Sequence, residues 1–148
     1  MITFVPLKKG KVIAVIYFLS LLYVTIFSRL LGTYPFTLVA GVNWKLFHWF
    51  RENSADDIIY GTGWWADFFG NVILFLPFIP CMKQLLENRK LFFYLLLAFF
   101  TSCCIEFIQY KFSIGLASID DVMLNTFGAW LGYILFPYAL RFYNELEK

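Results

Sequence analysis

Four long apolar runs constrain this chain more than any other feature of its sequence. They cover about residues 12–28, 66–86, 91–110 and 119–140, and each approaches the ~20 residues that an α-helix needs to cross ~30 Å of hydrocarbon. The composition agrees, because 61% of the 148 residues are hydrophobic and only 15% are charged, whereas soluble domains carry about 25% charged residues. We therefore expect an all-α membrane protein: one domain over residues 1–148, built as a bundle of four transmembrane helices.

The same composition excludes several classes of function. The length leaves no room for a separate soluble catalytic domain beside four spans. The formal net charge is only +2, with no run of five basic residues, so we expect no nucleic-acid partner. Cys81, Cys103 and Cys104 lie in apolar runs without C-x-x-C spacing or nearby histidines. We interpret them as small buried hydrophobic residues and not as a disulfide framework or a zinc site.

The basic residues predict how the bundle is oriented. The first run lacks a small-residue cleavage site after Ser28, so we expect a retained span and not a removed signal peptide. With the N-terminus in the cytoplasm, eight basic residues lie inside and four outside, which predicts two cytoplasmic termini in a bacterial cell membrane. The inside group is Lys8, Lys9, Lys11, Lys83, Arg89, Lys90, Arg141 and Lys148, and the outside group is Arg29, Lys45, Arg51 and Lys111.

The segment between the first and second runs is the longest one that does not span. On this orientation it is external. Within it, residues Asn43 to Glu52 place apolar side chains such as Trp44 and Phe47 on one broad arc and charged ones on the other. This pattern predicts an amphipathic interfacial helix that lies flat in the headgroup layer.

Polar side chains inside apolar spans are costly, so their positions are informative. Three of the expected helices carry them near the outer end, often four residues apart and so on one helix face. At ~1.5 Å per residue, Asn71, Glu106 and Asn125 all lie roughly 6 to 9 Å below the outer boundary, which predicts one shared pocket in the outer leaflet. The set is Asp67 and Asn71, then Ser102, Glu106 and Gln109, and then Asp120, Asp121 and Asn125.

Structural explanations compete with a functional one at most of these positions. Ser118 fits the N-cap of the last helix, with Asp121 completing a capping box. Asn71, Gln109 and Asn125 are able to hydrogen-bond between helices. Glu106 is the exception, because a carboxylate below the interface needs a partner, and Arg29 or Lys111 lies at a suitable depth.

Three segments carry a further pattern: FGNVILFLPF at residues 69–78, SCCIEFIQ at 102–109 and IDDVMLNTFGAWLGY at 119–133. Together they resemble the signature of the VanZ-like family of small bacterial membrane proteins. The resemblance implies a four-helix membrane domain, an association with low-level resistance to the glycopeptide teicoplanin, and characteristic polar positions. Those positions are Asn71, Glu106, Gln109, Asp121 and Asn125. Many relatives carry an arginine and an acid before the acidic pair, where this chain has Gly115 to Ser118.

Three hypotheses from different classes follow. In the first, Arg29, Asp67, Asn71, Gln109, Asp120 and Asn125 help Glu106 and Asp121 to bind or modify an outer-leaflet lipid headgroup, a lipid-linked cell-wall precursor or a lipidated antibiotic. The second is an intramembrane enzyme on a lipid-linked substrate, in which Glu106 and Asp121 act as acid and base or hold a divalent cation. The third is a structural membrane protein that forms a homo-oligomer through the G-x-x-x-G pair Gly128 and Gly132.

Overall fold

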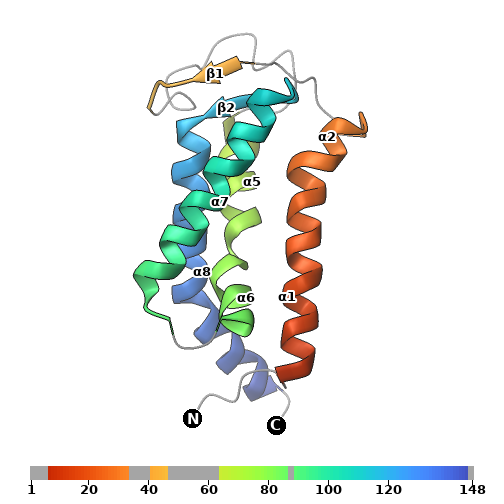
Figure 1. Ribbon diagram of the computed structural model, residues 1–148. Coiled ribbons are helices and arrows are strands. Elements are labelled where there is room, and N and C mark those ends of the chain that lie inside the picture. The colour runs from red at the N-terminus through yellow and green to blue at the C-terminus, as the bar shows by residue number, and fades with distance from the viewer. Residues whose placement is uncertain (1–6, 34–40, 47–63, 87–88, 147–148) are drawn as a thin grey trace.

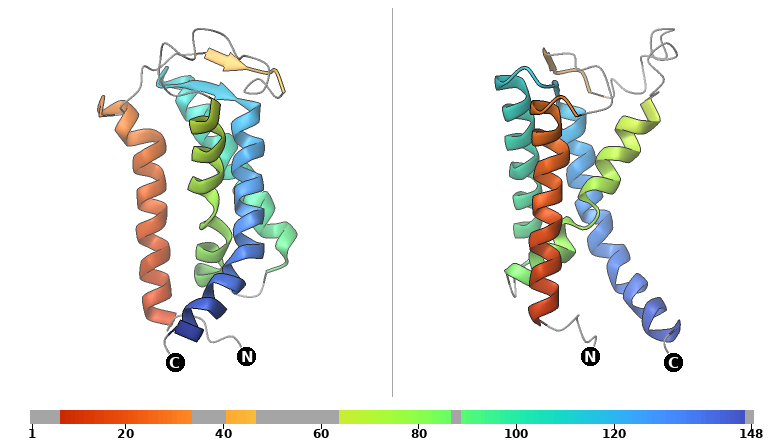
Figure 2. Two further views of the ribbon diagram at one scale, coloured as in Figure 1. Left: turned by 180° about the vertical axis from the view of Figure 1, so that it is seen from behind. Right: turned by 90° about the vertical axis from the view of Figure 1, so that its right-hand side faces the viewer.

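The computed structural model describes residues 7–33, 41–46, 64–86 and 89–146, with only the backbone course given for 7–8, 64–67 and 140–146. The chain is mostly helical, and its long helices run alongside one another (Figure 1). The start of α1 (Leu7–Leu22) and the end of α8 (Ile119–Leu146) lie at one end of the molecule. The strands β1 (Gly41–Asn43) and β2 (Leu116–Ser118) lie across the other end (Figure 2).

Three helical segments are long and apolar enough to cross a membrane: Lys9–Leu30, Phe68–Leu85 and Leu91–Lys111. They correspond to the first three predicted spans. The fourth predicted span, 119–140, is helical throughout as part of α8 but is not among these three segments. Its polar Asn125 and its residues Gly128, Gly132 and Pro137 lower the hydropathy of this stretch.

The first rod changes its helical type before it ends. α1 continues into the π-helix η1 (Tyr23–Phe27) and then into the short α2 (Ser28–Leu30). The Ser28 N–H donates to the carbonyl of Tyr23, five residues earlier, which is the π-helical pattern. The extra residue in this turn decides which side chains of the rod face the interior. Single π-turns of this kind are often found at functional sites.

The second span is broken at its prolines. α5 (Trp64–Phe75) ends before Pro77, and α6 (Phe78–Leu85) begins after it. Pro77 has no N–H to give to Ile73, and the Leu76 N–H donates to the Ile73 carbonyl instead, at 3.2 Å. Pro80 likewise cannot bond the Leu76 carbonyl. The break turns α5 away from the axis of α6, which is clear in the right-hand view of Figure 2.

Gly128 and Gly132 bring α8 against α5 within one chain, and the expected homo-oligomer through these glycines stays a prediction. Both glycines are buried within the chain. A Cβ atom at Gly128 would overlap the Val72 carbonyl oxygen, and one at Gly132 would overlap that of Leu76. Close helix approach of this type is what a G-x-x-x-G pair permits. The helix that lies against these glycines is α5 of the same chain.

The hydrophobic core centres on the break between α5 and α6. Phe75 and Phe78 stack with ring centroids 5.3 Å apart, and they pack in one cluster with Ile79 and with Tyr94 of α7 (Leu91–Lys111). The Tyr94 hydroxyl donates to the Leu86 carbonyl. This core fixes the relative positions of α1, α6, α7 and α8 below the polar end of the bundle.

Two expectations from the sequence need correction: the purely helical fold and the interfacial helix that begins at Asn43. β1 and β2 pair in parallel, with Gly41 opposite Leu116 and Asn43 opposite Ser118, so the fold is not purely helical. Because Asn43 is in a strand and Trp44 and Lys45 are not helical, the expected interfacial helix does not begin at Asn43. Its remainder, 47–52, lies outside the described residues.

All three cysteines are free thiols, and only one of them fits the expectation of a buried hydrophobic residue. Cys81 is buried, but Cys103 is half-buried and Cys104 is exposed.

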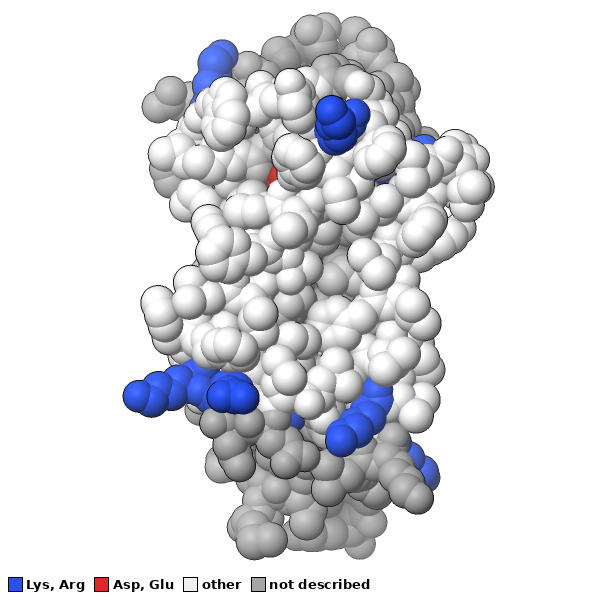
Figure 3. Space-filling view, in the orientation of Figure 1, with Lys and Arg blue, Asp and Glu red and all other residues white. Residues whose placement is uncertain are grey.

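On the face shown in Figure 3, basic side chains gather toward the two ends and the surface between them is almost entirely uncharged. Exposed large hydrophobic side chains of the helices include Ile16, Leu19 and Phe100. Such an uncharged band suits contact with hydrocarbon.

Candidate functional site

A polar cavity of about 160 Å³ lies near the end of the bundle that carries the strands. Its walls come from four parts of the chain: η1 with α2, α5, α7 and α8. It brings together six of the eight predicted site residues: Arg29, Asn71, Glu106, Gln109, Asp121 and Asn125. The remaining lining residues are Val24, Thr25, Gly70, Leu74 and Ile105.

The other two predicted site residues are not part of the described cavity. Asp120 is buried in the first turn of α8 and does not line it. The Asp120 N–H donates to Ser118 Oγ at 3.2 Å, so Ser118 is the N-cap that the sequence predicts. Asp67 lies on α5 one turn before Asn71, and its side chain is outside the described residues.

Glu106 connects the cavity to the start of α8. Its side chain is only 8% exposed, and its Oε2 accepts a hydrogen bond from the Ser118 N–H at 2.9 Å. In a capping box, the side chain of Asp121 in the same helix would accept the hydrogen bond of the Ser118 N–H. In this structure the carboxylate of Glu106 on α7 accepts it. The carboxyl group of Glu106 also lies beside the positive end of the α8 dipole, which favours its ionised form. Lys111, the other proposed partner of Glu106, is exposed and does not line the cavity.

Gln109 holds α7 against the π-turn. Its Nε2 donates to the Thr25 carbonyl at 3.1 Å. Beyond it, Arg29 Nη1 donates to the Ile114 carbonyl at 3.3 Å. A Cβ atom at Gly115 would come within 2.8 Å of Arg29 Nη1 and 2.9 Å of Gln109 Oε1. The absence of a side chain at Gly115 therefore lets the guanidinium and the amide lie where they do.

Asn125 has one satisfied and one unsatisfied end. Its Nδ2 donates to Ser102 Oγ at 2.8 Å. Its Oδ1 is buried and has no hydrogen-bond partner among the described residues. The residue as a whole is only 3% exposed. A buried acceptor without a donor costs about 1–3 kcal/mol. Because Asn125 lines the cavity, a bound molecule with a donor group would remove this cost.

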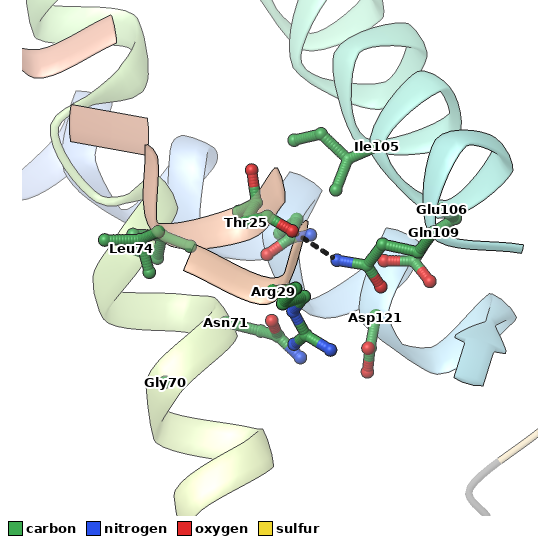
Figure 4. A pocket seen from close by; sticks show the side chains of 11 residues that line it. Thr25, Arg29, Gly70, Asn71, Leu74, Ile105, Glu106, Gln109 and Asp121 are labelled. Carbon is green, nitrogen blue, oxygen red and sulfur yellow. Dashed lines mark hydrogen bonds between the residues drawn. The ribbon is translucent and has the colours of Figure 1, made fainter. Parts of the chain in front are cut away.

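The close-up in Figure 4 shows how these groups are directed. The guanidinium of Arg29 projects between Asn71 and Asp121, and Gln109 and Glu106 reach toward it from α7. Donors and acceptors from different helices thus point into one space. The arrangement suits a ligand with several polar atoms.

Sequence reasoning missed some of the groups that build the site. Thr25 contributes both a wall and a carbonyl acceptor, and its position four residues before Arg29 is a signal that could have placed it. Gly70 lines the cavity without offering any chemical group, so no polar pattern identifies it.

Comparison with known proteins shows the family of this chain. The model of the VanZ/LLP1 family matches residues 14–141. The chain belongs to the VanZ/LLP1 family. It is 32% identical over 132 residues to Protein VanZ of Enterococcus faecium, an alignment that covers 81% of this chain and 80% of the relative. All the cavity-lining residues of this VanZ/LLP1 chain lie inside the matched range. No solved structure matches the chain.

The polar side chains that line this VanZ/LLP1 cavity are better suited to hydrogen bonds with a ligand than to binding a metal ion. In the part of the chain that the structure describes, no three His, Cys, Asp or Glu side chains come together as a metal site. Glu106 and Asp121 supply two carboxylates, but Arg29 places a positive charge in the same cavity. That charge opposes a cation and would attract the phosphate or hydroxyl groups of a polar ligand.

Proposed function

We propose that this VanZ/LLP1 protein binds the polar headgroup of an outer-leaflet amphiphile in the cavity between its helices. The ligand is a lipid, a lipid-linked cell-wall precursor or a lipidated antibiotic. The observation that carries the proposal is Asn125, whose buried Oδ1 has no partner in the described residues and lines a polar cavity. An acceptor held in this state is satisfied when a hydrogen-bonding ligand occupies the cavity.

The proposal includes a membrane topology of four spans with two cytoplasmic termini. The start of α1 and the end of α8 lie at the same end of the bundle, which an even number of crossings requires (Figures 1 and 2). Lys9, Lys11, Arg89 and Lys90 lie in the segments that this topology places in the cytoplasm. The cavity then lies in the outer leaflet, where a glycopeptide antibiotic or a surface lipid is within reach.

An amphiphile explains why the polar groups lie below a membrane surface. Arg29, Asn71 and Gln109 can donate to phosphate or hydroxyl oxygens, and Asp121 and Asn125 can accept from hydroxyl or amine groups. A headgroup carries such atoms at this depth, and its chains remain in hydrocarbon. The teicoplanin resistance that the family resemblance implies fits the same picture, because teicoplanin itself carries an acyl chain.

Drug susceptibility tests the proposal. We expect expression of the wild-type chain in a susceptible Gram-positive host to reduce susceptibility to teicoplanin more than to vancomycin. Asn125→Leu and Glu106→Gln should abolish this difference, because each changes the polar lining. The control Cys104→Ser changes an exposed position on α7 outside the cavity and should behave as wild type. Equal susceptibility of cells with the wild-type chain and with Asn125→Leu would contradict the proposal.

A second candidate, an intramembrane enzyme, rests on the meeting of Glu106 and Asp121 in one cavity. Two carboxylates are able to act as acid and base. The purified protein, incubated with membrane lipids and followed by mass spectrometry, distinguishes the two functions. New lipid products that disappear in Asp121→Asn would establish catalysis. Bound but unchanged lipid would support the binding function.

A further inference from the structure

Some residues that line the cavity are buried and others are exposed, and the exposed ones indicate where the cavity opens. Its deep wall comes from α7 and α8, where Ile105, Glu106 and Asn125 are buried. Its exposed members are Val24 of η1, which is 42% exposed, and Gly70 of α5. Both exposed members lie within segments apolar enough to span a membrane. The opening is therefore between η1 and α5, on the side of the bundle.

We infer that this cavity opens sideways into the hydrocarbon of the bilayer, between η1 and α5. The ligand is accordingly a membrane amphiphile that slides its headgroup in from the side and leaves its chains outside. The inference rests on the proposed function and adds the route by which the amphiphile enters, since a water-soluble molecule could not use this opening.

The surface around the opening is apolar. Tyr23 and Phe27 lie one residue before and one turn after Val24, and both are exposed. Phe69 and Ile73 flank Gly70 in the same way on α5, and Ile73 is 62% exposed. Exposed aromatic and aliphatic side chains on both sides of an opening suit lipid chains. A water-filled mouth would carry polar side chains at these positions.

Gly70 keeps the opening clear. A Cβ atom there would meet no atom within 4 Å, in contrast to Gly128 and Gly132, which a neighbouring helix requires to be small. A glycine inside a helix costs about 0.5–1 kcal/mol relative to alanine. Close packing does not explain that cost at Gly70. An unobstructed passage into the cavity explains it.

The arrangement of the helices agrees with an opening between η1 and α5. In the right-hand view of Figure 2, α5 diverges from the α1–η1 rod toward the end that carries the strands, and α8 passes behind the two. The cavity lies in this wedge, since η1 and α5 form two of its walls and α8 another.

Spin-label accessibility tests where the opening faces. A nitroxide is attached to a cysteine at Gly70 in full-length protein with Cys81, Cys103 and Cys104 replaced by alanine, in phosphatidylcholine–phosphatidylglycerol vesicles. We expect Gly70 to resemble a label at lipid-facing Ile73: frequent collisions with oxygen and few with a water-soluble nickel complex. A label at exposed Ser113, beyond the end of α7, provides the aqueous reference. A nickel response at Gly70 equal to that at Ser113 would overturn the sideways opening.

A plug in the opening tests the route with the native cysteines in place. Gly70→Leu puts an isobutyl group into open space, and Ser20→Leu adds the same group at an exposed position of α1 outside the cavity. Native mass spectrometry measures retained membrane lipid, and a second arm adds teicoplanin to lipid-stripped protein. We expect Gly70→Leu to lower binding about tenfold in whichever arm shows it, and Ser20→Leu to bind as wild type.

The outcomes separate the two claims. Lipid or teicoplanin bound equally by wild type and Gly70→Leu would overturn the sideways route and leave the binding function standing. No binding to the wild-type chain in either arm would overturn the proposed function itself.

Discussion

Glu106 combines a charge inside a polar cavity with a structural contact to another helix. Its Oε2 accepts the Ser118 N–H, so part of its role is to cap α8 from α7. We expect Glu106→Ala to lower the free energy of unfolding by about 1–3 kcal/mol, because the Ser118 N–H then has no acceptor. Glu106→Gln retains an oxygen at this position and should lose less.

Unfolding in mixed detergent micelles, followed by circular dichroism, measures this difference. The susceptibility assay on the same proteins then distinguishes the two roles of Glu106. A Glu106→Gln variant of near wild-type stability that still loses the teicoplanin effect would assign that effect to the charge. Equal loss of stability in both variants would show that the Ser118 contact depends on the charge itself.

The hydrogen-bonded pair of Ser102 and Asn125 can be replaced by apolar residues in a variant that keeps its stability and loses its function. Replacing both partners of a buried hydrogen bond by apolar groups is often neutral or stabilising. The double variant Ser102→Ala/Asn125→Leu also removes the unsatisfied Oδ1. We expect it to be at least as stable as wild type in the micelle assay and to lose the teicoplanin effect. A marked loss of stability would show that the Asn125 amide is needed for folding.

At this scale the sequence predicted most of the polar cluster, because charged and amide groups inside spans are rare and stand out. It could not predict the donor that Glu106 meets. That contact joins a side chain of α7 to a backbone N–H twelve residues later, across a turn. The spacing rule for a capping box predicted that Asp121 accepts the hydrogen bond of this N–H, because the rule considers one helix and not its neighbours.

Among the helices, the glycines of α5 and α8 have opposite roles. Gly132→Ala would force a Cβ atom into the Leu76 carbonyl oxygen and push α8 from α5. Overpacking of this kind costs about 1–3 kcal/mol or more. Gly70→Ala meets no neighbour and should raise stability by about 0.5–1 kcal/mol through helix propensity. The two variants, unfolded side by side in micelles, should therefore shift in opposite directions.

Equal stability of Gly132→Ala and wild type would contradict the tight contact of α8 with Leu76. The break in α5–α6 is connected with it, because Pro80 leaves the Leu76 carbonyl without its usual helical donor. Pro77 and Pro80 explain this break, because neither has an N–H for the helical ladder. The sequence did not predict η1, since nothing in the letters Tyr23 to Phe27 distinguishes a π-turn from an α-helix.

Nor did the sequence predict the two strands, each of which is only three residues long. Strands this short have no readable alternation of apolar and polar residues. Their pairing joins segments that are 75 residues apart, as between Gly41 and Leu116. Apolar length alone was sufficient for the three segments that can cross a membrane.

For the whole molecule, the proposed topology makes a prediction about sides of the membrane. A cysteine at Ser113 follows α7 at the end that carries the strands, and one at Lys90 precedes α7 at the other end. In a variant without native cysteines, a membrane-impermeant maleimide should label Ser113→Cys in intact protoplasts. Lys90→Cys should react only after permeabilisation. The reverse pattern would invert the orientation and move the cavity to the cytoplasmic leaflet.

The pairing of β1 with β2 also sets an order on assembly. β1 precedes three of the long helices, whereas β2 immediately precedes α8. During synthesis β1 therefore emerges long before the strand that completes it, and contacts between distant segments form late. Because Ser118 belongs to β2 and also bonds Glu106, the strand pair can close only on a bundle whose last helix has started correctly. We therefore expect the strand pair to form in the last stage of assembly, so that a chain whose membrane insertion stops before α8 leaves β1 without its hydrogen-bonded neighbour.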